Sequence, residues 1–88
     1  MEMLGKILVE GFKYRIVWKT PQQKYPRESI MLFVGMEGEA PLDSYRFSAR
    51  PVAGTQTLDQ HLVRLVQSVE QVPAGTPCVL NRILKEGA

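Results

Sequence analysis

Polar and apolar residues alternate most regularly between Phe12 and Thr20. A period of two sends successive side chains to opposite faces of an extended chain. We therefore predict a half-buried β-strand here, with an aromatic and aliphatic face toward a core and a basic face toward solvent. Phe12, Tyr14, Ile16 and Trp18 occupy one face, and Lys13, Arg15, Val17 and Lys19 occupy the other.

The same alternation returns between Ser44 and Val52, which predicts a second half-buried strand. If both strands belong to one sheet, their polar positions share its solvent face. The apolar positions of this second segment are Tyr45, Phe47 and Ala49, and the polar positions are Arg46, Ser48 and Arg50.

Two further segments are predicted to be strands. Met3–Val9 is apolar and β-branched enough to pair with the strand that starts at Phe12, and the residues between them have the length of a tight hairpin turn. Ile30–Met36 is a continuous apolar run with glycines at its end, which favours a strand over a short buried helix. Pro21–Pro26 is polar and contains two prolines, so we predict a loop there.

The spacing of apolar residues changes after Thr57. Thr57 and Gln60 form the pattern of a capping box, in which each side chain bonds a backbone amide near the start of a helix. Apolar residues then recur every three or four positions, and Pro73 ends the pattern. This predicts an amphipathic helix over residues 58–72. Its apolar stripe is Leu58, Leu62, Leu65, Val69 and Val72.

A strand is the alternative for part of this segment. Valine occupies positions 63, 66, 69 and 72, and β-branched residues favour strands. Arg64–Val72 would then be a strand after a short turn, and the fold would be a small β-barrel. The last segment, residues 77–84, has the caps and apolar spacing of a helix, but it fits a closing strand equally well.

Length and composition indicate one folded domain. The chain has 88 residues, of which 44% are hydrophobic and 23% charged, an ordinary globular composition with room for one core. Residues 1–88 are predicted to form a single domain of α+β class. It is expected to be a small, mostly antiparallel sheet of three to four strands with the helix of residues 58–72 packed on its aromatic face. The alternative is a small SH3-like or Sm-like β-barrel.

Residues for catalysis or metal binding are scarce. Cys78 and His61 are the one cysteine and the one histidine of the chain, and no family signature surrounds either of them. Glu37 and Glu39 lie in a glycine-containing loop, where we expect solvated charges. We therefore expect neither an enzyme nor a metal site nor a small-molecule cofactor.

A single cysteine cannot form an internal disulfide, which is typical of a reducing compartment. Met1–Gly11 has no apolar run long enough for a signal sequence or a membrane span. We expect a cytoplasmic protein that does not enter a membrane.

The charges are unevenly distributed along the chain. Residues 13–27 hold five bases and no acid, whereas residues 28–44 hold four acids and no base. The basic positions of the two alternating strands, extended by the adjoining loop, form a panel suited to nucleic-acid phosphates. The predicted nucleic-acid-binding residues are Lys13, Arg15, Lys19, Lys24, Arg27, Arg46 and Arg50.

The two charge blocks support another hypothesis. A basic segment and an acidic loop on one small molecule attract each other between copies, or recognise a protein partner. The sequence therefore indicates a small non-enzymatic accessory or interaction module. We expect the module to bind nucleic acid through the basic sheet face. Alternatively, it binds a protein partner or a second copy of the chain in a homo-oligomer.

Overall fold

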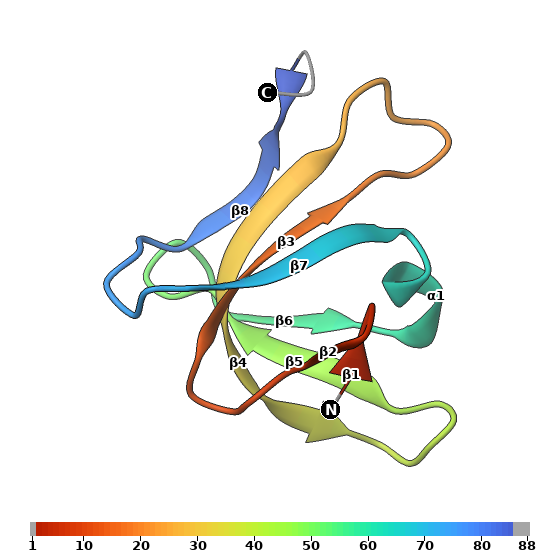
Figure 1. Cartoon of the computed structure of the whole chain (residues 1–88), viewed down its shortest axis with the longest axis vertical. Helices are drawn as coiled ribbons and strands as arrows, with labels where there is room; N and C mark the ends of the chain where they lie inside the picture. The colour runs from red at the N-terminus through yellow and green to blue at the C-terminus, as the bar shows by residue number, and fades with distance from the viewer. Residues whose placement is uncertain (1, 86–88) are drawn as a thin grey trace.

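The computed structural model describes residues 2–85, and nearly all of their regular structure is β-strand (Figure 1). Within these residues, a single short helix lies between the sixth and seventh strands. The elements are β1 (Glu2–Met3), β2 (Lys6–Ile7), β3 (Lys13–Trp18), β4 (Arg27–Glu37), β5 (Ser44–Ser48), β6 (Thr55–Leu58), α1 (Gln60–Val63), β7 (Val66–Val72) and β8 (Val79–Ile83).

Six of the strands form one antiparallel sheet in the order β6-β5-β4-β3-β7, and β8 is attached to β4. β4 is 11 residues long and is the spine of this sheet. One of its edges pairs with β3. Its other edge is shared, because β8 pairs with its first half as far as Ile30 and β5 pairs with its second half from Leu32 onward. The sheet therefore forks along β4.

The alternation predicted for the two half-buried strands is confirmed in the core of the fold. Tyr14 and Ile16 of β3 are buried, as are Tyr45 and Phe47 of β5. Phe33 of β4 joins them, with its ring centroid 5.4 Å from that of Phe47. The exceptions are Phe12, which precedes β3 and stays 44% exposed, and Val17, which is buried on the opposite face of β3.

The predicted pairing of Met3–Val9 with the following strand is wrong. Residues 2–7 form their own small hairpin, β1 with β2, which packs over one end of the core and buries Met3 and Leu8. The Tyr45 hydroxyl donates to the carbonyl oxygen of Glu2 and so ties the hairpin down. The physical reason for the difference is that β4 and β7 occupy both edges of β3, which leaves no edge for the N-terminal segment.

The predicted helix over residues 58–72 is also wrong, and with it the α+β class. Thr57 lies in β6, and Asp59 caps a helix of only 4 residues by accepting from the amide of Leu62 at 2.9 Å. Strand β7 follows. The alternative interpretation, in which residues 64–72 hold a strand after a short turn, describes the segment correctly, and residues 79–83 of the ambiguous tail are a strand as well.

A β-bulge explains the helical appearance of the sequence. Val66 lies opposite Trp18 and Val69 lies opposite Ile16, although the register shifts between Val17 and Trp18. The extra residue of the bulge lets two valines three positions apart face the same core, where a regular strand would separate them. In the sequence, this spacing of three residues looks the same as the spacing of apolar residues on one face of a helix. Among the described residues no ladder joins β6 to β7, so hydrogen bonds do not close the sheet into a ring.

The bulge gives a first test. Val69→Ala removes two buried methyl groups from the core side of β7, and we expect the free energy of unfolding to fall by about 2 kcal/mol. Gln67→Ala changes an exposed side chain in the same strand and is expected to alter it by less than about 0.5 kcal/mol. Urea denaturation of both variants measures the difference. Equal effects at the two positions would contradict the register described above.

Candidate functional site

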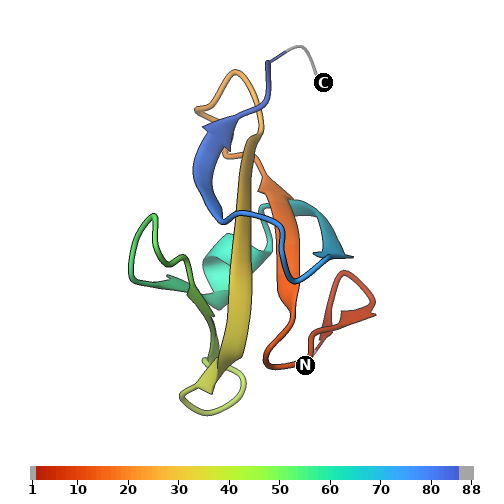
Figure 2. The same ribbon diagram turned by 90° about the vertical axis from the view of Figure 1, so that its left-hand side faces the viewer.

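The basic residues of β3 and β5 share the outer face of the sheet, opposite the core. This face is not fully open to solvent. Since β7 pairs with β3 and β8 pairs with β4, their connection, residues 73–78, must cross the β3–β4 pair, and Figure 2 shows it passing in front of β4. Lys13 Nζ donates to the carbonyl oxygen of Thr76 at 2.7 Å, which places the crossing on the outer face. Ile30 and Cys78 are both buried on this side.

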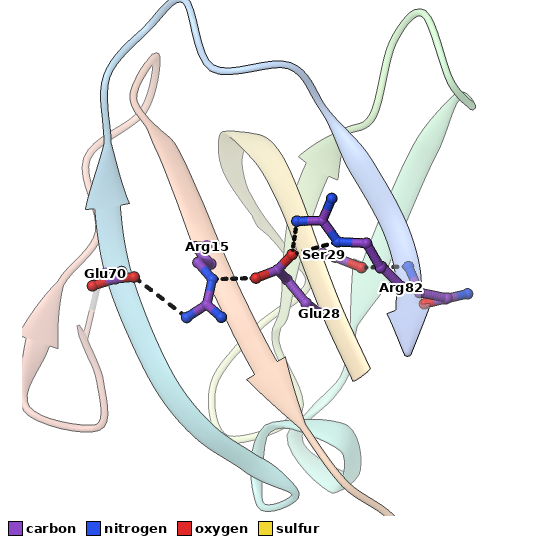
Figure 3. Close-up of polar contacts among 6 residues, drawn as sticks. Arg15, Glu28, Ser29, Glu70 and Arg82 are labelled. Atoms are coloured by element: carbon purple, nitrogen blue, oxygen red, sulfur yellow. Dashed lines mark hydrogen bonds and ion pairs between the residues drawn. The ribbon is translucent and has the colours of Figure 1, made fainter. Parts of the chain in front are cut away.

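A line of alternating charges crosses the same face (Figure 3). Arg15 donates to Glu28, and Arg82 donates to the other carboxylate oxygen of Glu28, through Nε at 2.8 Å and through a second guanidinium nitrogen. Arg15 also reaches Glu70 Oε1 at 3.4 Å. The line therefore joins β7, β3, β4 and β8. Arg15, a predicted phosphate ligand, is engaged in ion pairs inside the chain.

Glu28 is buried, with 3% of its side chain exposed, although it begins the acidic block of the sequence. Burial by itself raises the pKa of a carboxyl group, because it disfavours the charged form. Hydrogen bonds from Arg82 and Arg15, together with their positive charges, outweigh that effect and hold the pKa of Glu28 below its ordinary value. Glu28 is therefore an ionised, structural carboxylate.

The remaining predicted phosphate ligands are not gathered on one face. Arg46 is half-buried on the outer face of β5, and Arg50 is exposed in the turn that follows this strand. Lys19 and Lys24 lie in the loop between β3 and β4, where the Lys24 ammonium stands 5.4 Å from the ring centroid of Tyr25. Arg27 is the cross-strand partner of Trp18 and so lies on the inner face.

The inner face carries a feature that the sequence did not predict: an apolar cleft of about 140 Å³. It opens where the sheet forks, because β8 and β5, with β6 beyond it, share one edge of β4 and leave a space between them over the inner face of β3 and β4. Trp18 is half-buried in its wall. The apolar lining includes Ile16, Trp18, Met31, Leu58, Leu62 and Leu80.

Polar residues also line this Trp18 cleft: Ser29 from β4, Gln56 and Thr57 from β6, and Asn81 from β8. The backbone amide of Asn81 donates to the buried hydroxyl of Ser29 at 3.0 Å, which fixes the end of the cleft formed by β8. The two side-chain amides each offer donors and an acceptor to a bound group.

Basic residues lie next to the Trp18 cleft, although none of them lines it. Arg27 is the cross-strand partner of Trp18, and it lines a second hollow together with Lys24, Tyr25 and Ile83. We call Lys24 and Arg27 the basic rim of the cleft. In the described part of the chain, no Asp or Glu lines either hollow. The local potential at this end of the sheet therefore favours a group with negative charge.

Cys78 and His61, the one thiol and the one imidazole of the chain, lie on different elements. His61 is exposed on α1, and Leu62 of this helix lines the cleft on the inner face. Cys78 is a buried, free thiol in the connection that crosses the outer face. Within residues 2–85, no group of three or more His, Cys, Asp or Glu side chains is placed to hold a metal ion, and no helix is long and apolar enough to cross a membrane.

Known proteins offer no guide to this site. The chain matches no family model, and the comparisons with curated proteins and with solved structures found no match. The class of molecule is therefore defined by its own geometry, an antiparallel β module with one apolar, basic-rimmed cleft. Sequence reasoning missed the cleft because Leu58 and Leu62 were assigned to the core face of a helix, and no local pattern links them to Trp18 or Leu80.

The buried carboxylate gives the second test. Glu28→Gln removes the charge that holds Arg15 and Arg82, and we expect the free energy of unfolding to fall by about 2 kcal/mol. Glu70→Gln makes the same chemical change at an exposed partner of Arg15, and we expect less than about 0.5 kcal/mol. Denaturant unfolding near neutral pH compares the two. An equally small effect at both positions would show that Glu28 does not hold the strands together.

The pH dependence of stability is the third test. Because the pKa of Glu28 is lowered in the folded state, its contribution is complete above the unfolded pKa of about 4.3 and is lost as the pH falls through the folded value. The stability difference between the wild type and Glu28→Gln should therefore be largest near neutral pH and shrink below about pH 4. Thermal unfolding between neutral and acidic pH measures it, and a constant difference would contradict the assignment.

Proposed function

We propose that this protein is a non-enzymatic interaction module that binds a segment of a protein partner in the Trp18 cleft. One apolar side chain of the segment enters the cleft, and acidic residues beside it pair with Lys24 and Arg27 at the rim. The observation that carries the proposal is an open apolar cleft with a basic border on one face of the sheet.

The size of the cleft agrees with such a side chain. A dry cavity of about 150 Å³ accommodates a benzene molecule, so a volume of about 140 Å³ has space for one leucine, methionine or phenylalanine side chain. Binding sites are typically apolar with a few polar groups that fix orientation. Gln56 and Asn81 supply such groups and can bond the backbone of an extended partner segment.

The outer face supports the nucleic-acid hypothesis less well. Arg15 is paired with two carboxylates, and the ammonium group of Lys13 is bonded to the crossing connection. A cation that already has a partner gives up that interaction when it binds a phosphate. Nucleic acid is the second candidate for the Trp18 cleft itself. Lys24 and Arg27 stand there beside Trp18 and Tyr25, and aromatic side chains that can stack on nucleobases, with basic residues nearby, suit single strands.

The compartment that we propose is the cytoplasm. Cys78 is free, and the sequence has no second cysteine to pair with it, which fits a reducing environment.

Trp18 is the single tryptophan of the chain, so its fluorescence reports directly on the cleft. We expect a short peptide with a central leucine between glutamates to shift this fluorescence in a saturable way. The shift should be weaker at about 200 mM than at about 50 mM salt, because the rim contacts are exposed. A peptide with serine for leucine, and one with lysines for glutamates, should bind at least tenfold less tightly, about 1.4 kcal/mol.

Two matched arginine variants locate the binding surface. Arg27→Glu reverses a charge at the rim and should weaken the peptide about tenfold, whereas Arg46→Glu on the outer face should leave it unchanged. Equal losses in both variants would contradict the proposed site. Labelled single-stranded and duplex oligonucleotides are titrated in parallel. Binding of oligonucleotides without binding of the peptides would replace the protein partner with the second candidate.

A further inference from the structure

The acidic loop between β4 and β5 has the chemistry that the Trp18 cleft selects. Leu42 is 84% exposed, the highest value among the large hydrophobic side chains of the described residues. Its amide donates to the carbonyl oxygen of Glu39 at 2.9 Å, so that Glu39 and Leu42 bracket one tight turn. Glu37 and Glu39 are both exposed. An apolar side chain thus stands in solvent with carboxylates beside it.

The loop does not fill the cleft of its own molecule. Leu42 is 84% exposed, although Asp43 at the end of the loop accepts from the side-chain amide of Gln60 on α1, beside the cleft wall formed by Leu62. β4 separates the loop from the basic residues, because Arg27 is its first residue and Glu37 is its last. At 3.2–3.4 Å per residue, a strand of this length spans roughly 30 Å. The basic rim and the acidic loop therefore lie toward opposite ends of the spine strand, as Figure 1 shows.

We infer that the partner segment is the acidic loop of a second copy of this chain. The inference rests on the proposed function of the cleft and identifies its occupant. Leu42 of one copy enters the cleft beside Trp18 of the next, and Glu37 and Glu39 approach Lys24 and Arg27 across the contact. The cleft has the volume for one leucine side chain, and the charges of the two surfaces are opposite in sign.

This contact has a defined symmetry. The two surfaces that meet are different, so the interface is heterologous, and each copy keeps one free cleft and one free loop. Association then continues into open chains, unless the rotation between copies closes a ring. A contact built on one inserted side chain and a few exposed ion pairs is small and weak, with a dissociation constant on the order of 10⁻⁴ M.

Sedimentation of the wild-type protein tests the inference first. Its weight-average mass should rise steadily between roughly 10 μM and 1 mM protein at low salt and fall back toward the monomer when salt is added, since exposed ion pairs are screened. Leu42→Ser should leave a monomer throughout. Val52→Ser is the matched control, because it also removes an exposed aliphatic side chain from a turn, and it should associate like the wild type.

A mixing experiment tests the two surfaces together. The loop variant Glu39→Lys/Leu42→Ser and the rim variant Lys24→Glu/Arg27→Glu should each be monomeric alone. Mixed in equal amounts, they should form a heterodimer that grows no further, because only one complementary pair of surfaces remains. Mass growth in either variant alone, or no complex in the mixture, would overturn the inference.

One outcome separates this inference from the proposed function. A synthetic peptide of residues 37–43 should shift the fluorescence of Trp18 in wild-type protein diluted to low micromolar concentration. If the leucine and glutamate peptides bind but the wild type stays monomeric at 1 mM, on the order of ten times the expected dissociation constant, the cleft binds another protein and the self-association is refuted. If no peptide shifts the fluorescence, both ideas fail.

Discussion

One buried carboxylate holds in place the part of the sheet on which the cleft is built. Glu28 lies near the start of β4, and its burial would be costly without compensating charges, so it draws Arg15 from β3 and Arg82 from β8. Its neighbour Ser29 faces the other way and accepts the amide of Asn81. Strand β8 is therefore fastened to β4 on both faces by consecutive residues. Only in that position can Leu80 form a wall of the Trp18 cleft.

The same interaction divides the positive charge of the molecule between two environments. On the outer face, Arg15 lies between Glu28 and Glu70, and the connection from β7 to β8 covers part of the surface. At the inner end of the sheet, Arg27 and Lys24 border an apolar hollow that has no carboxylate among its described lining residues. The formal net charge of +2 does not show how the positive charges are distributed over the two faces. Lys24 and Arg27 therefore stand next to an apolar cavity and outside the line of ion pairs.

The sequence predicted the parts of this fold that depend on near neighbours. The alternation of β3 and β5 and the loop that contains Pro21 follow from local periodicity and proline chemistry. The N-terminal pairing, the helix and the cleft depend on which distant strands occupy each edge and on one bulge beside Trp18. Glu28 shows the limit most clearly: the sequence places it only in an acidic block, because its partner Arg82 is 54 residues away. A local pattern shows which side chains share a face of a strand. Contacts with residues far away in the sequence determine which elements cover that face.

The forked edge of β4 links the cleft to the loop that we propose as its occupant. A shorter strand could pair with only one neighbour on this edge. Because β4 has 11 residues, β8 pairs with its first half and β5 pairs with its second half. The fork leaves the Trp18 cleft at one end. At the other end the chain must turn from β4 into β5, and this turn carries Leu42 into solvent. An open apolar cleft and an exposed apolar turn are thus two consequences of one long strand. Each leaves apolar surface in water, and a contact between copies removes both from solvent at once.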